Sequence, residues 1–302
     1  MNVESRSADR PPDQSPDRAP DRTPDRATDP TPADRRPDRA SSHDARTAEP
    51  ASPVAYLDMV LAEDTAQAYK RVMLELLQPR AGDCVLDIGC GTGDDARAVA
   101  RLVAPGGRVI GLDTDVRMLA EAWRRSAPLR LPLEFRVGRA ERLEFEDGTF
   151  SACRSDRVWQ HVPNPDRALA EVVRVSRPRA RIVIADVDWD LLAINIEPRG
   201  VTRRIVAHLC DTRAAQGWMG RQLHGRFRQA GLTDVAVWPS TFATSDRVTA
   251  DRLWKLRSAA EAAHAAAVID DHELAAWTDA LDRPNPTFFA AITGFIVRGI
   301  TP

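Results

Sequence analysis

Large apolar side chains are absent from the first part of this 302-residue chain. No Leu, Ile, Val, Phe, Trp, Tyr or Met occurs between Val3 and Val54, where Pro-Asp-Arg recurs among small polar residues. Such a segment buries too little apolar surface to offset the entropy lost on ordering. Its Asp and Arg charges nearly cancel, which does not favour an arm that binds nucleic acid or lipid. We therefore predict a disordered tail over residues 1–53 and a folded domain over residues 54–302.

Long apolar runs are missing as well. No run of about 18 apolar residues occurs, and the N-terminus lacks the apolar segment of a signal peptide, so the sequence predicts neither a membrane span nor export. The 42 basic and 44 acidic residues give a net charge of −2, which offers no electrostatic reason to expect nucleic acid as a partner. We therefore expect a cytoplasmic protein with a small-molecule or protein substrate. The sequence does not decide between a monomer and a homodimer.

Cysteine is scarce, and its spacing excludes the common metal and redox motifs. Cys84, Cys90, Cys153 and Cys210 include no Cys-x-x-Cys pair. Cys84 and Cys153 stand in apolar runs that have the length of buried strands. We therefore expect buried thiols that pack as small apolar side chains.

Apolar patterns typical of strands and helices alternate along the next part of the chain, with glycine or proline between them. The predicted helices cover residues 69–77, 96–103, 116–125 and 167–175, and the predicted strands cover residues 84–88, 108–112, 133–137, 150–154 and 182–185. This order predicts an α/β fold with a doubly wound, mostly parallel, seven-stranded sheet.

The pattern loosens after Trp189. The sequence predicts a helix over residues 202–216, a strand over 235–238, an alanine-rich helical stretch over 246–281 and a last strand over 295–297. We expect helical insertions near residues 189–231 and 245–283 to cover a pocket.

The most informative segment follows the first predicted strand. It reads Val-Leu-Asp-Ile-Gly-Cys-Gly-Thr-Gly over residues 85–93, and Asp113 ends the second strand. Glycines let the backbone turn tightly and approach a ligand, while an acid at the end of the neighbouring strand can accept hydrogen bonds from both ribose hydroxyls. The combination predicts a site for an adenosine-type ligand.

A dinucleotide is the first alternative for such a loop. Its fingerprint needs a third glycine or alanine where this chain has Asp94, and Asp95 follows. A pyrophosphate binds at the positive N-terminal end of the next helix, where two carboxylates would repel it. A phosphate-free, positively charged ligand suits the site better, and S-adenosylmethionine is such a ligand because it carries a sulfonium and an ammonium group.

Residues 85–93 resemble motif I of the class I S-adenosylmethionine-dependent methyltransferases. The resemblance extends over residues 54–187 and the final strand, and it is to the ubiquinone- and menaquinone-biosynthesis type and its small-molecule relatives. It implies S-adenosylmethionine as cofactor and a small-molecule methyl acceptor, in secondary metabolism or quinone-like biosynthesis, with no nucleic acid and no membrane partner. The cofactor-binding residues that we expect are Asp87, Gly89, Cys90, Gly91, Gly93, Asp113, Thr114, Met118, Ala140, Glu141 and Ser155.

The resemblance also implies a role for several of these residues. Asp87 would face the methionine ammonium group, directly or through water, and the three glycines would line the methionine and the ribose. Asp113 would hold the ribose hydroxyls, and Met118 would pack on the adenine.

Ser151 and residues 179–180 depart from the family pattern at turns and strand ends, and one further departure bears on the ligand. Where an Asp commonly receives the adenine amine, this chain has Arg139, which cannot accept a hydrogen bond. Backbone groups near Ala140 or the carboxylate of Glu141 are then expected to bind the adenine.

The chemistry of such a fold takes place beyond the carboxyl ends of its strands. The substrate-pocket candidates are Tyr56, Asp156, Gln160, Asp188 and Trp189. His161 has the best residue type for a catalytic general base, because an unperturbed histidine pKa near 6.5 suits proton removal at neutral pH. His161 could equally tie down the start of a helix, and Tyr56 could belong to an N-terminal lid or serve packing.

Three acids alternate after the strand that ends near Ala185. Asp186, Asp188 and Asp190, together with Asp156, would suit a Mg²⁺-dependent enzyme if they converged. The position of Trp189 among them favours hydrogen-bonding acids, and we expect no metal.

Two other functions stay open. An enzyme of the same fold could cyclise or rearrange a metabolite while the cofactor serves a structural role. The departure at Arg139 also leaves open a non-catalytic binding protein.

Overall fold

The computed structural model describes residues 52–302. The predicted tail, residues 1–53, lies outside the described residues except for its last two positions. There, helix α2 (Pro53–Leu61) begins, because the Ser52 side chain accepts a hydrogen bond from the backbone N–H of Ala55 and Pro53 occupies the first turn. The first described helix thus begins one residue before the predicted boundary at residue 54.

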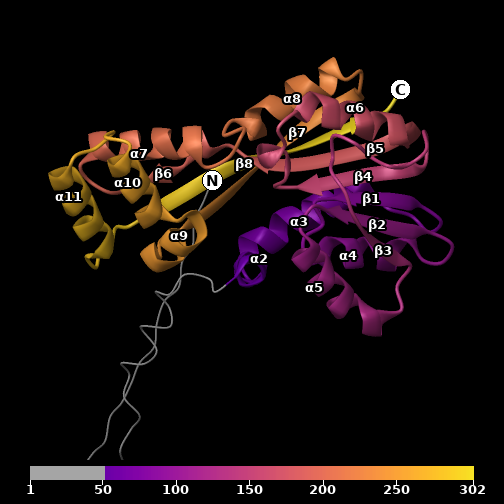
Figure 1. Cartoon of the computed structure of the whole chain (residues 1–302), viewed down its shortest axis with the longest axis horizontal. Helices are drawn as coiled ribbons and strands as arrows, with labels where there is room; N and C mark the ends of the chain where they lie inside the picture. The colour runs from indigo at the N-terminus through magenta and orange to yellow at the C-terminus, as the bar shows by residue number, and fades with distance from the viewer. Residues whose placement is uncertain (1–51) are drawn as a thin grey trace, which may run out of the picture. The chain divides into compact units, whose positions relative to one another are not determined.

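One sheet of eight strands organises the domain (Figure 1). The strands are β1 (Cys84–Ile88), β2 (Arg108–Asp113), β3 (Leu133–Val137), β4 (Phe150–Asp156), β5 (Ser176–Val187), β6 (Ala193–Ile194), β7 (Thr233–Thr244) and β8 (Ala290–Ile300). Their order is β3-β2-β1-β4-β5-β8-β6, and β7 pairs with the other side of β8. The five strands from β3 to β5 are parallel, and β8 is antiparallel to its neighbours.

The predicted doubly wound, mostly parallel α/β fold is therefore confirmed, but the predicted number of seven strands is wrong. The additional strand, β6, has only two residues, too few to produce an alternating apolar pattern. All four cysteines are buried and free, as their apolar surroundings predicted.

Helices cover both faces of the sheet because successive strand residues point to opposite sides. Val85 packs on one face with α3 (Asp64–Leu77), α4 (Asp94–Val103) and α5 (Val116–Ser126). Leu86 packs on the other face with α6 (Pro165–Val175) and α8 (Met219–Gln229). The strands are apolar on both faces, as expected of a parallel sheet between two helical layers.

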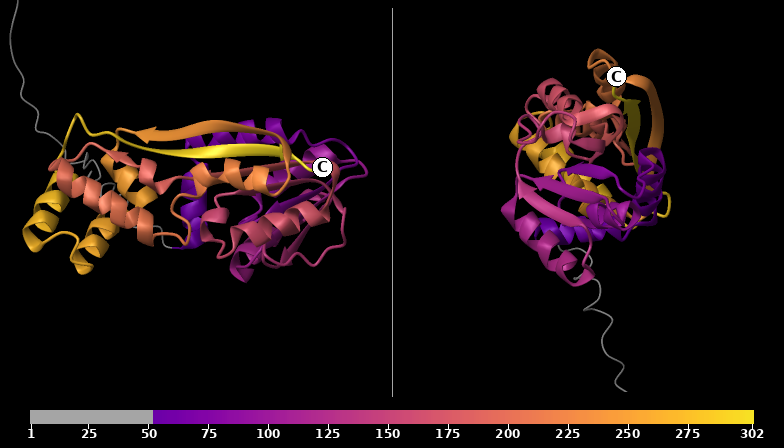
Figure 2. Two further views of the ribbon diagram at one scale, coloured as in Figure 1. Left: turned by 90° about the horizontal axis from the view of Figure 1, so that it is seen from above. Right: turned by 90° about the vertical axis from the view of Figure 1, so that its right-hand side faces the viewer.

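A second group of helices, here called the helical cap, comprises α7 (Arg199–Thr212), α9 (Arg247–Trp254), α10 (Leu256–Ala265) and α11 (Asp271–Asp282). Figure 2 shows β7 and β8 running side by side as a ribbon that continues from the sheet to the cap. The cap encloses its own apolar core around Trp254 and Trp277. Within residues 52–302 no helix has the length and apolar character needed to cross a bilayer.

The predicted long helical stretch is divided in the structure. Lys255 adopts a left-handed conformation with φ of 57° and separates α9 from α10. The chain leaves helical conformation again before the side chain of Asp270 caps α11. These two breaks make α9, α10 and α11 three separate helices of the cap.

Candidate active site

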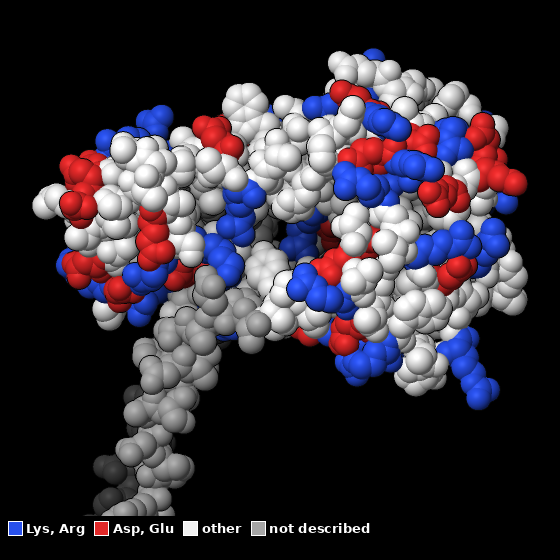
Figure 3. Space-filling view, viewed as in Figure 1, with Lys and Arg blue, Asp and Glu red and all other residues white. Residues whose placement is uncertain are grey.

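A cavity of about 1250 Å³ lies between the carboxyl ends of the parallel strands and the helical cap. Figure 3 shows it as a hollow in the centre of the molecular face. Typical sites for one small molecule occupy roughly 300–1,000 Å³. The cavity therefore has room for a cofactor and a second small molecule. One side is lined by the loops that follow β1, β2, β3, β4 and β5 and is here called the sheet wall. The other side, here called the cap wall, is lined by residues of α7, α9 and α10 together with Arg213 and Lys255.

The glycine loop after β1 bends over the end of β2. The backbone N–H groups of Gly89 and Cys90 both donate to the carbonyl of Leu112, at 2.7 and 3.0 Å. Gly89 has a φ of 69°, and a Cβ atom there would lie 2.1 Å from the Val158 side chain. A side chain at this position would therefore be strained and would also collide with a neighbour.

Asp113 is held at the end of β2 by backbone donors. Its Oδ2 accepts from the N–H of Gly91 at 2.8 Å, and its Oδ1 accepts from the N–H of Asp115 at 2.9 Å. Each oxygen keeps a further lone pair. The carboxylate lines the cavity and can accept two more hydrogen bonds from a ligand.

Asp87 is buried beneath the glycine loop. Its Oδ1 accepts from Arg154 Nη1 at 2.9 Å, while its Oδ2 is buried and has no hydrogen-bond partner among residues 52–302. Burial raises the pKa of Asp87 to about 6, and Arg154 opposes this shift by favouring the ionised form. An unpaired buried oxygen of this kind is costly unless a donor reaches it.

Most of the residues predicted from the sequence line the same cavity. These are the cofactor candidates Gly89, Gly91, Asp113, Thr114, Met118, Ala140 and Glu141, the candidate base His161, and the pocket candidates Tyr56, Asp156, Gln160 and Trp189. The structure thus brings residues from the beginning and the middle of the chain to one site.

Five predicted residues do not line the cavity. Asp87 lies beneath the loop, and Ser155 Oγ donates to the Ile88 carbonyl at 2.9 Å. Gly93 begins α4 and packs so closely on Phe135 that a Cβ atom would lie 2.7 Å from that ring. Cys90 is buried against Gly111. Asp188 is fully buried and pairs with Arg221.

Sequence reasoning missed a charged network behind the sheet wall. Lys70 on α3 pairs with Asp95 and, at 2.8 Å, with Asp156. Tyr69 donates from its hydroxyl to Asp156 at 3.0 Å. The network fixes α3 against the start of α4 and the end of β4. No local pattern could reveal it, because Lys70 and Asp156 are 86 residues apart.

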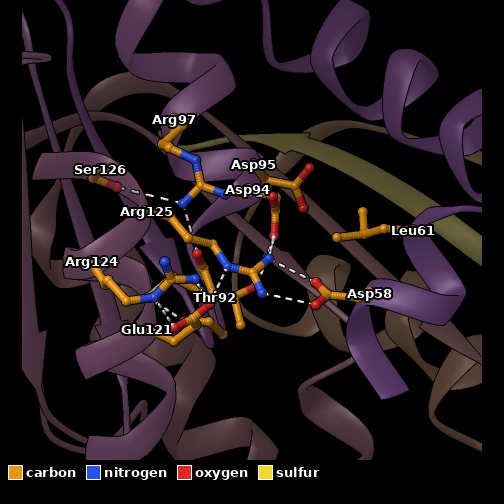
Figure 4. Close-up of polar contacts among 12 residues, drawn as sticks. Asp58, Leu61, Thr92, Asp94, Asp95, Arg97, Glu121, Arg124, Arg125 and Ser126 are labelled. Carbon is orange, nitrogen blue, oxygen red and sulfur yellow. Dashed lines mark hydrogen bonds and ion pairs between the residues drawn. The ribbon is translucent and has the colours of Figure 1, made fainter. Parts of the chain in front are cut away.

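Figure 4 shows how Asp94 at the start of α4 is neutralised. Asp94 pairs with Arg97 and accepts from Thr92 Oγ1 at 2.7 Å. Arg125 on α5 donates to both carboxylate oxygens of Asp58, at 2.7 and 2.8 Å. This second pair ties α2 to α5 and keeps α2 beside the glycine loop.

A chain of hydrogen bonds near the ends of β4 and β5 links Asp186, Gln160 and Trp189. Asp186 accepts from the backbone N–H of Gln160 at 2.9 Å and from Gln160 Nε2 at 2.8 Å, and Gln160 Oε1 accepts from Trp189 Nε1 at 2.8 Å. Burial raises the pKa of Asp186 to about 7. The chain of bonds fixes Gln160 in the cavity wall.

His161 stands next to Gln160 in the short helix η2 (Trp159–His161). Burial lowers its pKa below the ordinary histidine value, and the nearby charges of Arg213 and Arg157 lower it further. The imidazole is therefore neutral at neutral pH and can accept a proton.

The three alternating acids at and beyond the end of β5 make different contacts. Asp186 binds Gln160, whereas Asp188 and Asp190 both bind Arg221 on α8. Among residues 52–302 no group of three or more His, Cys, Asp or Glu side chains gathers in a way that could hold a metal. The acids act as hydrogen-bond acceptors and ion-pair partners in this structure.

Comparisons with known proteins identify the family. A family model described as a methyltransferase domain matches residues 86–184. The chain is 39% identical over 244 residues to an uncharacterized 37.1 kDa protein in transposon TN4556 of Streptomyces fradiae. This match covers 81% of this chain and 70% of that protein. The chain is 31% identical over 132 residues to a demethylmenaquinone methyltransferase of Lactobacillus johnsonii. The chain is a class I S-adenosylmethionine-dependent methyltransferase.

The match to the Lactobacillus johnsonii enzyme covers 43% of this methyltransferase and 54% of that enzyme, so it spans about half of the relative's length. The solved structure of the YcgJ protein from Bacillus subtilis has a TM-score of 0.55 at 18% identity, and the match covers 78% of this chain and 98% of that one. At this identity the structural likeness shows a shared fold.

The residues of this methyltransferase fit S-adenosylmethionine. The unpaired Oδ2 of Asp87 needs a donor, and the cofactor's ammonium group is one. The Asp113 carboxylate, fixed by two backbone N–H groups, has lone pairs for ribose hydroxyls. The acids of the sheet wall suit a cofactor that carries positive charge and no phosphate.

Proposed function

We propose that this methyltransferase transfers the methyl group of S-adenosylmethionine to a small molecule bound between the sheet wall and the cap wall. The observation that carries the proposal is the single cavity, about 1250 Å³, that continues from Asp113 to the cap helices. Its volume exceeds what one ligand needs. The cytoplasmic location expected from the sequence and the absence of a nucleic acid partner remain part of this proposal.

The sheet wall would bind the cofactor. Asp113 accepts hydrogen bonds from the ribose hydroxyls, and the Oδ2 of Asp87 accepts from the ammonium group, directly or through water. Met118 packs on the adenine. The family's usual acid at the adenine end is missing, and Arg139 Nη2 donates to Glu141 Oε1 at 2.9 Å. The other oxygen of Glu141 and the backbone near Ala140 would receive the adenine amine.

The cofactor, when bound, supplies a methyl group already activated by the sulfonium. The protein therefore has to position the acceptor and exclude water. Gln160, fixed by Asp186, orients the acceptor from the sheet wall. His161 accepts the acceptor's proton at an imidazole nitrogen, since its lowered pKa keeps it neutral. The aromatic residues of the cap exclude water from the reacting atoms.

Two measurements test this proposal. Isothermal titration with S-adenosylhomocysteine measures cofactor-site binding, and incubation with methyl-labelled S-adenosylmethionine and a panel of small acceptors measures transfer. We expect both binding and transferred label. A protein that does not bind S-adenosylhomocysteine, or that binds it but never releases label to any acceptor, would contradict methyl transfer.

A further inference from the structure

The two walls of the cavity differ in charge. All of the acids that line the cavity come from the sheet wall: Asp113, Asp115, Glu141, Asp156 and Asp186. The cap wall contributes His208, Arg213 and Lys255, and in the described part of the chain no Asp or Glu of the cap lines the cavity. Figure 3 shows Lys and Arg side chains beside the hollow on the side of α9. The cap wall is therefore positively charged.

Arg213 is the central cation of this wall. It follows the end of α7, its Nη1 donates to the Trp254 carbonyl at 3.0 Å, and its guanidinium lies 4.4 Å from the centre of the Trp189 ring. Among residues 52–302 no carboxylate forms an ion pair with it. Burial lowers the pKa of Arg213, yet a guanidinium stays charged at any working pH. Arg213 is half-buried, and a partly desolvated guanidinium without a carboxylate partner favours an anion at its exposed side.

Arg157 faces the same volume from the sheet wall. It follows β4 with a φ of 58°, and its Nε is buried without a hydrogen-bond partner in the described part of the chain. Asp156 Oδ1 forms a long ion pair with Arg157 Nε at 3.7 Å, while Lys70 pairs with the other oxygen of Asp156. Arg157 and Arg213 both lower the pKa of His161. The two guanidinium groups thus act on one region, next to the proposed base.

The same end of the cavity is rich in aromatic surface. It is lined by Tyr56, Phe242, Trp254 and Phe295. Tyr56 is fixed there because its hydroxyl donates to the Leu253 carbonyl at 3.2 Å. An apolar, ring-sized body fits such walls.

We propose that the methyl acceptor is an apolar, ring-sized molecule with one anionic group, a carboxylate or a phosphate, and that Arg213 of the cap binds this group opposite Arg157. This inference rests on the proposed function and names its substrate class. The planar donor fork of Arg matches the oxygens of both anions. A positively charged wall does not suit the cationic cofactor, whereas an anionic acceptor offsets both guanidinium charges.

The test uses four naphthalene probes with the full chain saturated with S-adenosylhomocysteine. These are 2-naphthoate, 2-naphthyl phosphate, the neutral isostere 2-naphthamide and the cation 2-naphthylmethylamine, each titrated by calorimetry. We expect one of the anions to bind at least about tenfold more tightly than the amide, as a charge-assisted hydrogen bond provides. The anion that binds more tightly distinguishes a carboxylate acceptor from a phosphate acceptor.

Variants of the cap wall locate the effect. Arg213→Gln should reduce the anion preference to less than about threefold, while Arg213→Lys should keep part of it, because the charge remains but the planar donor fork is lost. Arg203→Gln is the matched control. Arg203 is an exposed arginine of α7, the helix that Arg213 follows, and it does not line the cavity. Thr212→Glu, at an exposed lining position, should also remove the preference and serves if Arg213→Gln does not fold.

The outcomes separate this inference from the proposed function. Failure of the wild type to bind S-adenosylhomocysteine contradicts the proposed function itself. Normal S-adenosylhomocysteine binding with equal affinity for anion and amide, or with preference for the amine, overturns only the anionic acceptor. A preference that survives both Arg213→Gln and Thr212→Glu overturns it as well, because the anion would then bind elsewhere.

Discussion

The sheet wall and the cap wall of this methyltransferase present polar groups in different ways. On the sheet wall, backbone N–H groups fix the carboxylates, as those of Gly91 and Asp115 fix Asp113. On the cap wall, Arg213 donates to the Trp254 carbonyl, lies over the Trp189 ring and has Tyr56 as a further side-chain partner. A carboxylate that is held by backbone N–H groups suits a ligand that all members of a family bind. Side chains on separate helices suit a ligand that changes between members.

The two regions also have separate cores. The cap is built around Trp254 and Trp277, whereas the sheet packs its two faces against α3 to α5 and against α6 and α8. Cofactor affinity should therefore depend on the sheet, and acceptor affinity on the cap. Four substitutions can break or sharpen this division, beginning with the largest expected effect.

His161→Ala should lower kcat by about 10²- to 10⁴-fold, the usual contribution of a general base. S-adenosylhomocysteine affinity should not change, because His161 belongs to the acceptor end. In the wild type, kcat should rise with pH through the pKa of His161. Because that pKa is lowered, the acid limb should lie below pH 6.5, the ordinary value.

His272→Ala, an exposed histidine of α11, is the control for this experiment and should leave kcat and its pH profile unchanged. An acid limb that persists unchanged in His161→Ala would mean that another group accepts the proton.

Trp277→Ala should destabilise the cap by about 3–5 kcal/mol, the usual cost of removing a fully buried Trp. Its ring is buried, and its Nε1 donates to Thr202 Oγ1 at 2.8 Å. Chemical denaturation measures the loss, and calorimetry should find S-adenosylhomocysteine affinity retained. If cofactor affinity falls with cap stability, the two regions do not act separately.

Asp113→Ala should weaken S-adenosylhomocysteine binding about 100-fold, because two hydrogen bonds from ribose to a charged acceptor are lost. The matched control is Asp246→Ala, which removes another carboxylate held by backbone N–H groups, here at the start of α9. Asp246 does not line the cavity, so this control should bind S-adenosylhomocysteine normally. Equal affinity of Asp113→Ala and wild type would refute the ribose contact.

Asp270→Ala should have the smallest effect, a loss of about 1 kcal/mol of stability, as expected when an N-cap is removed. The Asp270 side chain and Glu273 form a reciprocal capping box at the start of α11. Thermal unfolding measures the change, and neither cofactor nor acceptor binding should respond. A larger loss, or an effect on S-adenosylhomocysteine, would show that α11 supports more than the cap.

The sheet wall could be predicted from the sequence because its signals are local. The glycine loop and Asp113 stand at fixed distances along the chain, and strand residues are apolar on both faces. Two predicted strands were too short: β5 begins at Ser176 rather than at residue 182, where residues 177–179 are exposed, and β8 begins at Ala290 rather than at residue 295.

The cap and its chemistry could not be predicted in the same way. Helix α8 was not predicted separately, although its buried Met219, Leu223 and Phe227 recur every four residues. One expected helical stretch became three helices, because the chain leaves helical conformation at Lys255 and again before Asp270. Arg213 and Arg157 lie 56 residues apart and meet only through the packing of the cap on the sheet. Asp188 was expected in the pocket, but it is buried and forms an ion pair with Arg221 of α8.

A crystal structure of the complex with S-adenosylhomocysteine would test the division between the walls most directly. We predict that the ribose hydroxyls lie within hydrogen-bond distance of Asp113 and that the sulfur faces an open space bounded by His161 and Arg213. An S-adenosylhomocysteine molecule bound against the cap helices, with no ribose contact to Asp113, would contradict the account.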